Sequence, residues 1–186
     1  MHLMIDIETL STHKDAAVLS IGMAWFDGNA IIDTCHIAIK PAYIDGHIDA
    51  RTVAWWAGQG SEAREAAFGG DVSQSQAKLN FRDFVKLHEA DEVWANSPSF
   101  DLVILNSWWY RGDRPCEWPL HFRTERDCRT MFALGRELNI EFGHVWDLSS
   151  TAHNALDDAC NQARAVIAIR RGMHEHMSIY NGSVLR

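Results

Sequence analysis

The sequence predicts an α/β protein whose central mixed sheet, an antiparallel hairpin joined to parallel strands, is flanked by helices. Two observations indicate this class. Three apolar, strand-like segments follow one another before Pro41, and segments with helical spacing of apolar residues then alternate with short strand-like ones. The chain has 186 residues, of which 47% are hydrophobic, and this is enough for one sizeable core. We therefore expect a single domain over residues 1–186.

The first strand is expected over residues 2–8, because apolar side chains stand at every second position there. The alternation puts Asp6 and Glu8 together on the opposite face of the strand. The next two strands are expected over residues 17–26 and 30–40, and the Asp-Gly-Asn turn between them favours a hairpin.

Helices and short strands are expected to alternate over the rest of the chain. A glycine-rich stretch, residues 58–71, interrupts the pattern and is expected to be irregular. The polar tail beyond Gly172 is expected to fray. The expected helices cover residues 49–58, 73–89, 100–109 and 129–138 and a last segment that begins near Asn154, and the expected short strands cover residues 92–95 and 122–125.

The formal net charge of −8 at pH 7 argues against a broadly basic surface that binds nucleic acid tightly and without specificity. It does not exclude a nuclease, because acidic residues can be metal ligands and bound cations change the local field. Six arginines gather in one region, and two readings stay open: a local track for phosphates or a solvated helix face. They are Arg111, Arg114, Arg123, Arg126, Arg129 and Arg136.

No run of residues approaches the length of a membrane-spanning helix, and the acid at Asp6 comes too early for the apolar segment of a signal peptide. We therefore expect no membrane association and a cytoplasmic location. The four cysteines form no Cys-x-x-Cys pair, so we expect free thiols rather than a zinc ribbon. His174-Glu175-His176 lacks the His-Glu-x-x-His spacing of a metal motif and is expected to be solvated.

Five residues are candidates for chemistry. Asp6 and Glu8 lie roughly 7 Å apart along one strand, and either could be a solvated surface acid if the strand were not central. Asp101 follows a polar loop and begins an apolar helix, where an acid can be a cap or a ligand. Carboxylates that cluster are destabilising unless a cation neutralises them, so a shared site for these acids implies metal ions.

His153 and Asp158 are five positions apart, which separates side chains on an ideal helix because neighbours are three or four apart. The pair can serve one site if His153 lies in the loop before the helix and Asp158 lies on its second turn, with start signals at residues 149–151. His153 is then free to move while Asp158 is held rigidly. Asp157 points about 100° away around the helix, so we expect Asp158 to face the site.

In this order, Asp-x-Glu, Phe-Asp and His-x4-Asp resemble the motifs of the DEDDh exonucleases of the DnaQ-like superfamily, which have a ribonuclease-H-like fold. The motifs span most of the chain, and His-Asn-Ala-Leu-Asp-Asp-Ala is especially similar to the third motif of the family. A narrower resemblance, to the small phage and bacterial exonucleases grouped with exodeoxyribonuclease VIII, rests on residues 52–56 and 61–64. Thr9-Leu10-Ser11, after the first motif, also fits this phage-type branch better than the polymerase proofreaders.

The resemblance implies 3′→5′ release of nucleoside 5′-monophosphates from single-stranded or overhanging DNA or RNA. Oxygen ligands suit magnesium or manganese better than zinc, and the family holds two such ions, one beside the attacking water and one beside the leaving oxygen. His153 would accept the proton of that water as general base. The four implied metal ligands are Asp6, Glu8, Asp101 and Asp158.

The expected partner is the 3′ end of a nucleic acid. By resemblance, Thr9 and Leu10 contact the terminal nucleotide, and Phe100 either stacks on a base or packs in the core. The tryptophan pairs at residues 55–56 and 108–109 have the same two readings. Relatives often dimerise, which leaves a homodimer open.

Two other classes of function compete. A catalytically idle nucleic-acid-binding or scaffold protein with this fold should have lost a ligand or the histidine, and the sequence retains all five. An endonuclease of ribonuclease-H type is disfavoured because the His-x4-Asp motif belongs to the exonuclease branch. The choice between RNA and DNA depends on contacts to the 2′-hydroxyl, which the sequence does not define.

Overall fold

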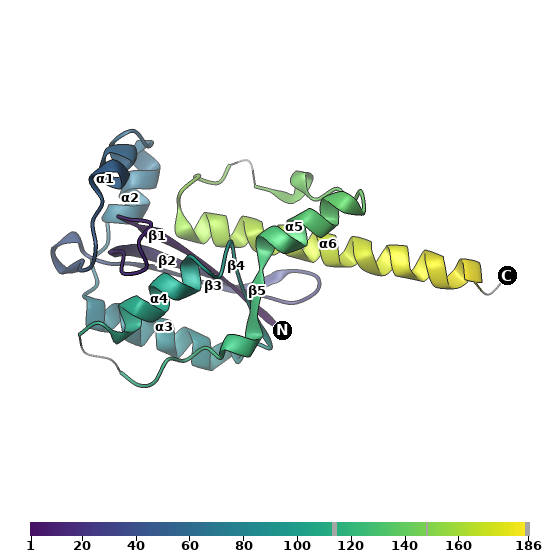
Figure 1. Ribbon diagram of the computed structural model, residues 1–186, viewed down its shortest axis with the longest axis horizontal. Helices are drawn as coiled ribbons and strands as arrows, with labels where there is room; N and C mark the ends of the chain where they lie inside the picture. The colour runs from purple at the N-terminus through teal and green to yellow at the C-terminus, as the bar shows by residue number, and fades with distance from the viewer. Residues whose placement is uncertain (113–114, 148, 185–186) are drawn as a thin grey trace.

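The computed structural model describes residues 1–112, 115–147 and 149–184, with side chains up to residue 178. Among these residues one mixed sheet of five strands is covered by helices on both faces (Figure 1), so the predicted α/β class is confirmed. The strands are β1 (His2–Thr9), β2 (Val18–Phe26), β3 (Ile31–Ala38), β4 (Glu92–Ala95) and β5 (Glu125–Asp127), and the helices are α1 (Ala50–Ala57), α2 (Ser61–Phe68), α3 (Gln74–His88), α4 (Asp101–Tyr110), α5 (Cys128–Glu137) and α6 (Ala155–Val184).

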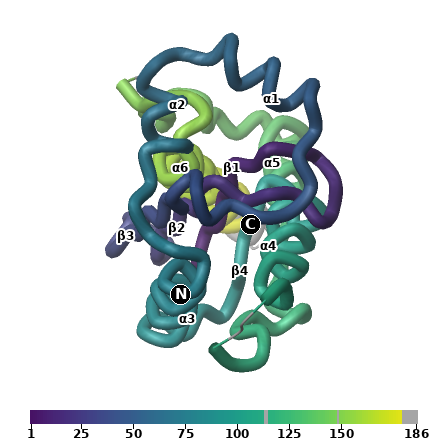
Figure 2. Tube along the Cα trace, turned by 90° about the vertical axis from the view of Figure 1, so that its left-hand side faces the viewer, coloured from purple at the N-terminus to yellow at the C-terminus, as the bar shows by residue number. Residues whose placement is uncertain are grey.

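The sheet has the order β3-β2-β1-β4-β5. The strands β1, β2 and β3 pair antiparallel, as the predicted hairpin requires, whereas β4 runs parallel to both β1 and β5. Figure 2 shows the sheet between α3 and α4 on one side and α5 and α6 on the other. The first strand is therefore central, with a neighbouring strand on each edge and helices on each face.

The two faces of β1 pack against different helices, as the alternation of its side chains predicts. Leu3, Ile5 and Ile7 belong to the core cluster formed with α3 and α4. Met4 belongs to the cluster formed with α5 and α6. Asp6 and Glu8 follow Met4 on the α6 face, at the end of the strand near α1 and α2 (Figure 1).

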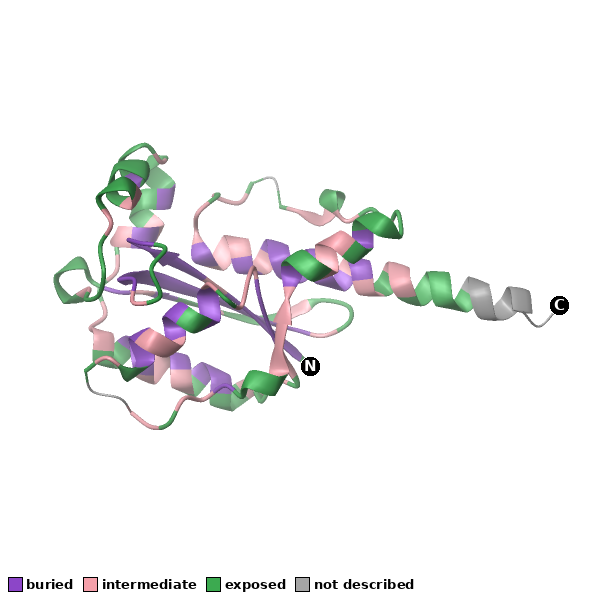
Figure 3. Ribbon diagram, viewed as in Figure 1, coloured by how far each residue is buried: buried purple, intermediate pink, exposed green. Residues whose placement is uncertain are grey.

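A close approach between α6 and β2 brings the start of α6 onto the sheet. A Cβ atom added to Gly22 would lie 2.0 Å from the backbone oxygen of Ala155, so only glycine permits this contact. The next small residues on the same helix face, Ala159 and Ala163, are fully buried. From there α6 runs back across the sheet in the direction opposite to β1, and its second half projects from the body (Figures 1 and 3).

Three local expectations were wrong. The stretch expected to be irregular contains α2, because Gly60 and Gly69 lie at the two ends of this helix while Ala63 and Ala67 bury against Trp56. The tail beyond Gly172 is helical to the end of the described residues. The strand expected over residues 122–125 is a short 3-10 helix followed by β5.

The structure also bears on the cysteines and on the helices that a membrane protein would need. The four cysteines are free thiols, as expected. None of the helices in the described part of the chain combines the length and the apolar character that crossing a bilayer requires.

Candidate active site

Four carboxylates converge on the α6 side of the sheet, and three different elements supply them. β1 provides Asp6 and Glu8, the first residue of α4 is Asp101, and Asp158 lies in the first turn of α6 rather than the expected second. Asp101 is only 2% exposed and Glu8 9%. Acids are rarely buried this deeply without a partner, so the cluster requires an explanation beyond solvated surface charge.

The four acids interact electrostatically. Burial, followed by repulsion from Asp101 and Glu8, raises the pKa of Asp6 well above its ordinary value. Burial raises the pKa of Glu8 to about 8, and the carboxylates of Asp158 and Asp101 add to this effect. Because these like charges disfavour one another's ionisation, a compensating cation would stabilise the ionised cluster.

The pKa values of the two helix-borne acids are raised for the same main reason. Burial raises the pKa of Asp101 to about 7, although hydrogen bonds from backbone N–H groups oppose the shift. Burial also raises the pKa of Asp158, against a hydrogen bond from the backbone of His153. The Oδ2 atom of Asp101 is buried and has no hydrogen-bond partner among the described residues.

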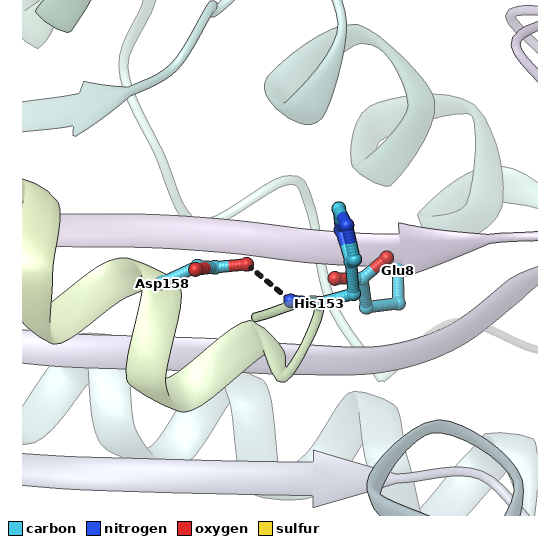
Figure 4. Close-up of side chains that lie close together, drawn as sticks. All are labelled: Glu8, His153 and Asp158. Carbon is cyan, nitrogen blue, oxygen red and sulfur yellow. Dashed lines mark hydrogen bonds between the residues drawn. The ribbon is translucent and has the colours of Figure 1, made fainter. Parts of the chain in front are cut away.

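The donor atoms fit divalent cations. Glu8, His153 and Asp158 each offer one ligand atom, and these three atoms lie within 4.8 Å of one another (Figure 4). Asp6 and Asp101 lie outside this group of three but interact electrostatically with Glu8, and Asp101 offers the unpartnered Oδ2 atom. Hard cations such as magnesium and manganese prefer oxygen ligands of this kind.

The loop before α6 separates the roles of two adjacent acids. Asn154 caps the helix, since its side-chain oxygen accepts from the backbone N–H of Leu156 at 3.0 Å; the cap is therefore not one of residues 149–151. Asp157 accepts from the backbone N–H of Thr151 at 2.8 Å and braces the loop. Asp158, rather than Asp157, lies beside Glu8.

His153 lies in that loop, as the five-residue spacing requires. Its backbone N–H donates to Asp158 Oδ2 at 3.0 Å, and its φ angle of 64° is in the left-handed region (Figure 4). Its ring meets the ring of Trp55 edge to face, with centroids 4.7 Å apart. A non-glycine residue held in this backbone region is often part of a functional site. Here Asp158 holds the backbone of His153, and Trp55 packs against its ring.

The two tryptophans of the first pair differ: Trp56 packs in the core, whereas Trp55 is exposed and could contact a base. Trp56 is buried, and its indole N–H donates to the backbone oxygen of Thr9 at 2.9 Å, which anchors α1 on the end of β1. Trp55 is 43% exposed and stands beside the carboxylates. The second pair, Trp108 and Trp109, is fully buried in the core.

A pocket of about 540 Å³ opens next to Glu8. Phe100 and Trp55 contribute aromatic walls, and Thr9 lies on its lining as well. Leu10 does not line this pocket; its side chain is 8% exposed and packs with Trp56 in the core. Of the three residues expected to touch substrate, Thr9 and Phe100 therefore line the pocket and Leu10 does not.

The arginines do not form one continuous track in the described part of the chain. Arg111 donates to the backbone oxygens of Asp15 and Ala16, and Arg126 forms an ion pair with Glu92. Arg129 lies close enough to the acids to act on them: it hydrogen-bonds Asn96, and its charge opposes the rise in the pKa of Asp101. Arg123 and Arg136 are exposed, and Arg114 lies outside the described residues.

One residue at the site was not found from the sequence. Gln162 donates from Nε2 to Asp6 Oδ1 at 2.7 Å and is 3% exposed. Its spacing of four residues from Asp158, which places both side chains on one helix face, is the signal that could have identified it.

A mixed sheet with carboxylates gathered at its centre, from β1 and from the first turns of two helices, is the arrangement that the resemblance to the DnaQ-like 3′-5′ exonucleases implies. A family model described as the 3′-5′ exoribonuclease Rv2179c-like domain matches residues 1–170. The chain belongs to this family. The resemblance found in the sequence motifs is therefore confirmed.

A relative among curated proteins is the exodeoxyribonuclease of enterobacteria phage T4. It is 29% identical over 119 residues, which cover 55% of this chain and 52% of the relative. The chain thus matches about half the length of that protein.

Solved structures share the fold. The zinc-bound form of E. coli ExoI with single-stranded DNA matches with a TM-score of 0.64 and 15% identity over 94% of this chain and 40% of that one. Exonuclease X in complex with 5′ overhanging duplex DNA matches with a TM-score of 0.53 and 17% identity over 92% of each chain. S. pombe Pop2p, bound to Mg²⁺ and Mn²⁺, matches with a TM-score of 0.61 and 13% identity over 91% of this chain and 82% of that one. These likenesses show the ribonuclease-H-like fold.

Proposed function

We propose that this chain is a single-domain, metal-dependent 3′→5′ exonuclease that hydrolyses the terminal phosphodiester bond and releases nucleoside 5′-monophosphates. The observation that carries the proposal is the convergence of four carboxylates and His153 beside a pocket of about 540 Å³, in a chain that belongs to an exonuclease family. Pockets of this size suit small ligands, so the terminal nucleotide is the natural occupant.

The proposed metal ligands are Asp6, Glu8, Asp101 and Asp158, which together would hold two magnesium or manganese ions. When bound, such ions offset the charge of the phosphate and make a water molecule a stronger nucleophile near neutral pH. The raised pKa values of the four acids support this assignment, because a buried anionic cluster needs a compensating positive charge.

His153 is the proposed general base, and its ring accepts the proton of the attacking water. The left-handed backbone and the contact with Trp55 hold the ring beside the carboxylates. The same geometry would allow His153 to be a metal ligand. His153→Ala distinguishes the two roles. If His153 is the general base, the variant should lose activity and retain manganese binding. If His153 is a metal ligand, the variant should lose both activity and manganese affinity.

The proposed substrate site is the pocket beside Glu8. Phe100 and Trp55 offer aromatic faces on which a base can stack without regard to its sequence. Thr9 lies on the lining, with its hydroxyl donating to the backbone oxygen of Ser11, and Leu10 could contact the nucleotide only through its backbone. We propose single-stranded or overhanging 3′ ends as substrates. We also propose a cytoplasmic location. Gel filtration decides between a monomer and a homodimer.

The test is digestion of 5′-labelled single-stranded DNA and RNA oligonucleotides of matched sequence, each with magnesium or manganese. We expect a ladder that shortens from the 3′ end and mononucleotide products, and the relative rates identify the preferred nucleic acid. An idle binding protein would retain both oligonucleotides intact. Internal cleavage of the RNA strand of a hybrid would instead indicate an endonuclease of ribonuclease-H type.

A further inference from the structure

We propose that Gln162 is a positioning residue of the carboxylate cluster: its side-chain amide holds Asp6 in one orientation through Oδ1 and leaves Oδ2 for a cation. This inference rests on the metal site of the proposed function. It concerns a residue that touches neither the pocket nor the reacting atoms and acts only through Asp6.

The position of Gln162 follows from how α6 crosses the sheet. Four residues of helix rise roughly 6 Å, which matches the roughly 7 Å between alternate residues of a strand. Because α6 runs opposite to β1 (Figure 1), Asp158 stands beside Glu8 and Gln162, one turn further along α6, stands beside Asp6. The acids of β1 thus meet two successive turns of one helix face.

The observed orientation of the amide matches an ionised Asp6, the form that a bound cation would favour. An ionised carboxylate only accepts hydrogen bonds, so the NH₂ end of Gln162 must face it, at the observed 2.7 Å. This orientation leaves Gln162 Oε1 buried without a hydrogen-bond partner among the described residues. A buried unpartnered oxygen is destabilising, and an apolar residue at this position would avoid it. We infer that the hydrogen bond from the Gln162 amide to Asp6 has a function that outweighs the destabilising effect of the unpartnered oxygen.

A neutral donor suits the site better than the alternatives. A lysine at this position would neutralise Asp6 and compete with a bound cation. A glutamate would add a fifth carboxylate to a cluster that already disfavours ionisation. An apolar side chain would leave Asp6 free to rotate. Outer partners that orient metal ligands in this way commonly change metal affinity or activity by about 10-fold or more.

The test is manganese binding, measured by calorimetry and by electron paramagnetic resonance without nucleic acid. Gln162→Met, which preserves volume and removes the donor, is expected to weaken binding about 10-fold. Gln162→Lys is expected to raise the melting temperature of the metal-free protein and yet abolish manganese binding, a pair of opposite effects that a purely structural role does not produce. In the Asp6→Asn background Gln162→Met should add nothing, because its effect passes through Asp6.

Asn161→Leu is the matched control. Asn161 is a buried amide on the same helix, and it bonds the backbone of Asp147 and the hydroxyl of Ser150 rather than a carboxylate of the cluster. This variant should lose thermal stability and retain manganese affinity. If Gln162→Met does not fold, Gln162→Asn, whose amide is too short to reach Asp6, replaces it.

The outcomes separate the two proposals. Absence of manganese binding by the wild-type protein would overturn the proposed function. Normal binding by the wild type together with unchanged affinity in the Gln162 variants would overturn the role of Gln162 and leave the metal site standing.

Discussion

The two faces of β1 belong to one strand and have opposite chemistry. On one face Leu3, Ile5 and Ile7 bury against α3 and α4. On the other face Met4 packs against α6, and the two positions that follow are Asp6 and Glu8. The apolar face contributes burial free energy at every position, whereas the acidic face brings together like charges that oppose folding unless a cation neutralises them.

This contrast explains why the acids are on the central strand. A strand that is paired on both edges and covered by core on one face cannot shift in register without exposing that core, so its second face is held rigidly. The acidic face thereby gains ligand positions that vary little, at the expense of stability in the metal-free state. Substitutions on the two faces should therefore separate stability from chemistry.

The largest expected effect is on the acidic face. Asp158→Asn should reduce exonuclease activity by about 10²–10³-fold, since removing one group that stabilises developing charge commonly has an effect of this size. The variant should fold at least as stably as the wild type without metal, because it removes one of the repelling carboxylates. Steady-state digestion and thermal melting check the two statements.

Asp157→Asn is the control for this prediction, because the adjacent acid bonds the backbone of Thr151 rather than the cluster. It should lose some stability and most of its activity should remain. Equal loss of activity in the two variants would mean that the loop, and not the charge of Asp158, is what matters.

The apolar face gives the opposite result. Ile5 is fully buried, and Ile5→Ala should lower the free energy of unfolding by about 3 kcal/mol, which for a chain of this size lowers the melting temperature by about 10 °C. Activity per folded molecule, measured well below the melting temperature, should stay near that of the wild type. A large loss of activity in the folded variant would show that the two faces are not independent.

The same contrast decides what the sequence could predict. The alternation in β1, the acids at the starts of α4 and α6 and the loop position of His153 are local patterns, and they were predicted. Gln162 and Gly22 were not, because their roles depend on how α6 lies across the sheet: Gln162 meets Asp6 across 156 positions of the chain, and Gly22 admits the backbone of Ala155. α2 was missed because glycines next to a helix look, in the sequence, like glycines that break one.

Stability should depend on pH in a direction set by the acidic face. The pKa of Glu8 is raised to about 8 in the folded protein, above its unfolded value, so the stability that its neutral form contributes is present at low pH and is lost as pH rises toward 8. Titration of Glu8 alone should therefore lower the stability of the metal-free protein by on the order of 2 kcal/mol between pH 5 and pH 7. Melting curves in a chelator measure the loss.

Manganese should restore stability, and the restored amount should grow over the same pH range, because the ion binds the ionised acids. Glu8→Gln removes one of the four acids with a raised pKa and should make the pH profile in the chelator shallower, while Asp6, Asp101 and Asp158 still titrate. A profile of this variant as steep as that of the wild type would contradict the assignment.

The smallest expected effect is at Trp55, which stands where the acidic face meets the pocket. If Trp55 stacks on the terminal base, Trp55→Leu should raise KM about 10-fold, since base stacking on an aromatic side chain is worth about 1–3 kcal/mol. If its main use is the edge-to-face contact with His153, the same variant should lower kcat and change KM little. Trp55→Phe retains an aromatic face and should lie close to the wild type in both cases. Val53, which is exposed on the same helix, supplies the control Val53→Ala, and unchanged kinetics in all three variants would exclude both uses of Trp55.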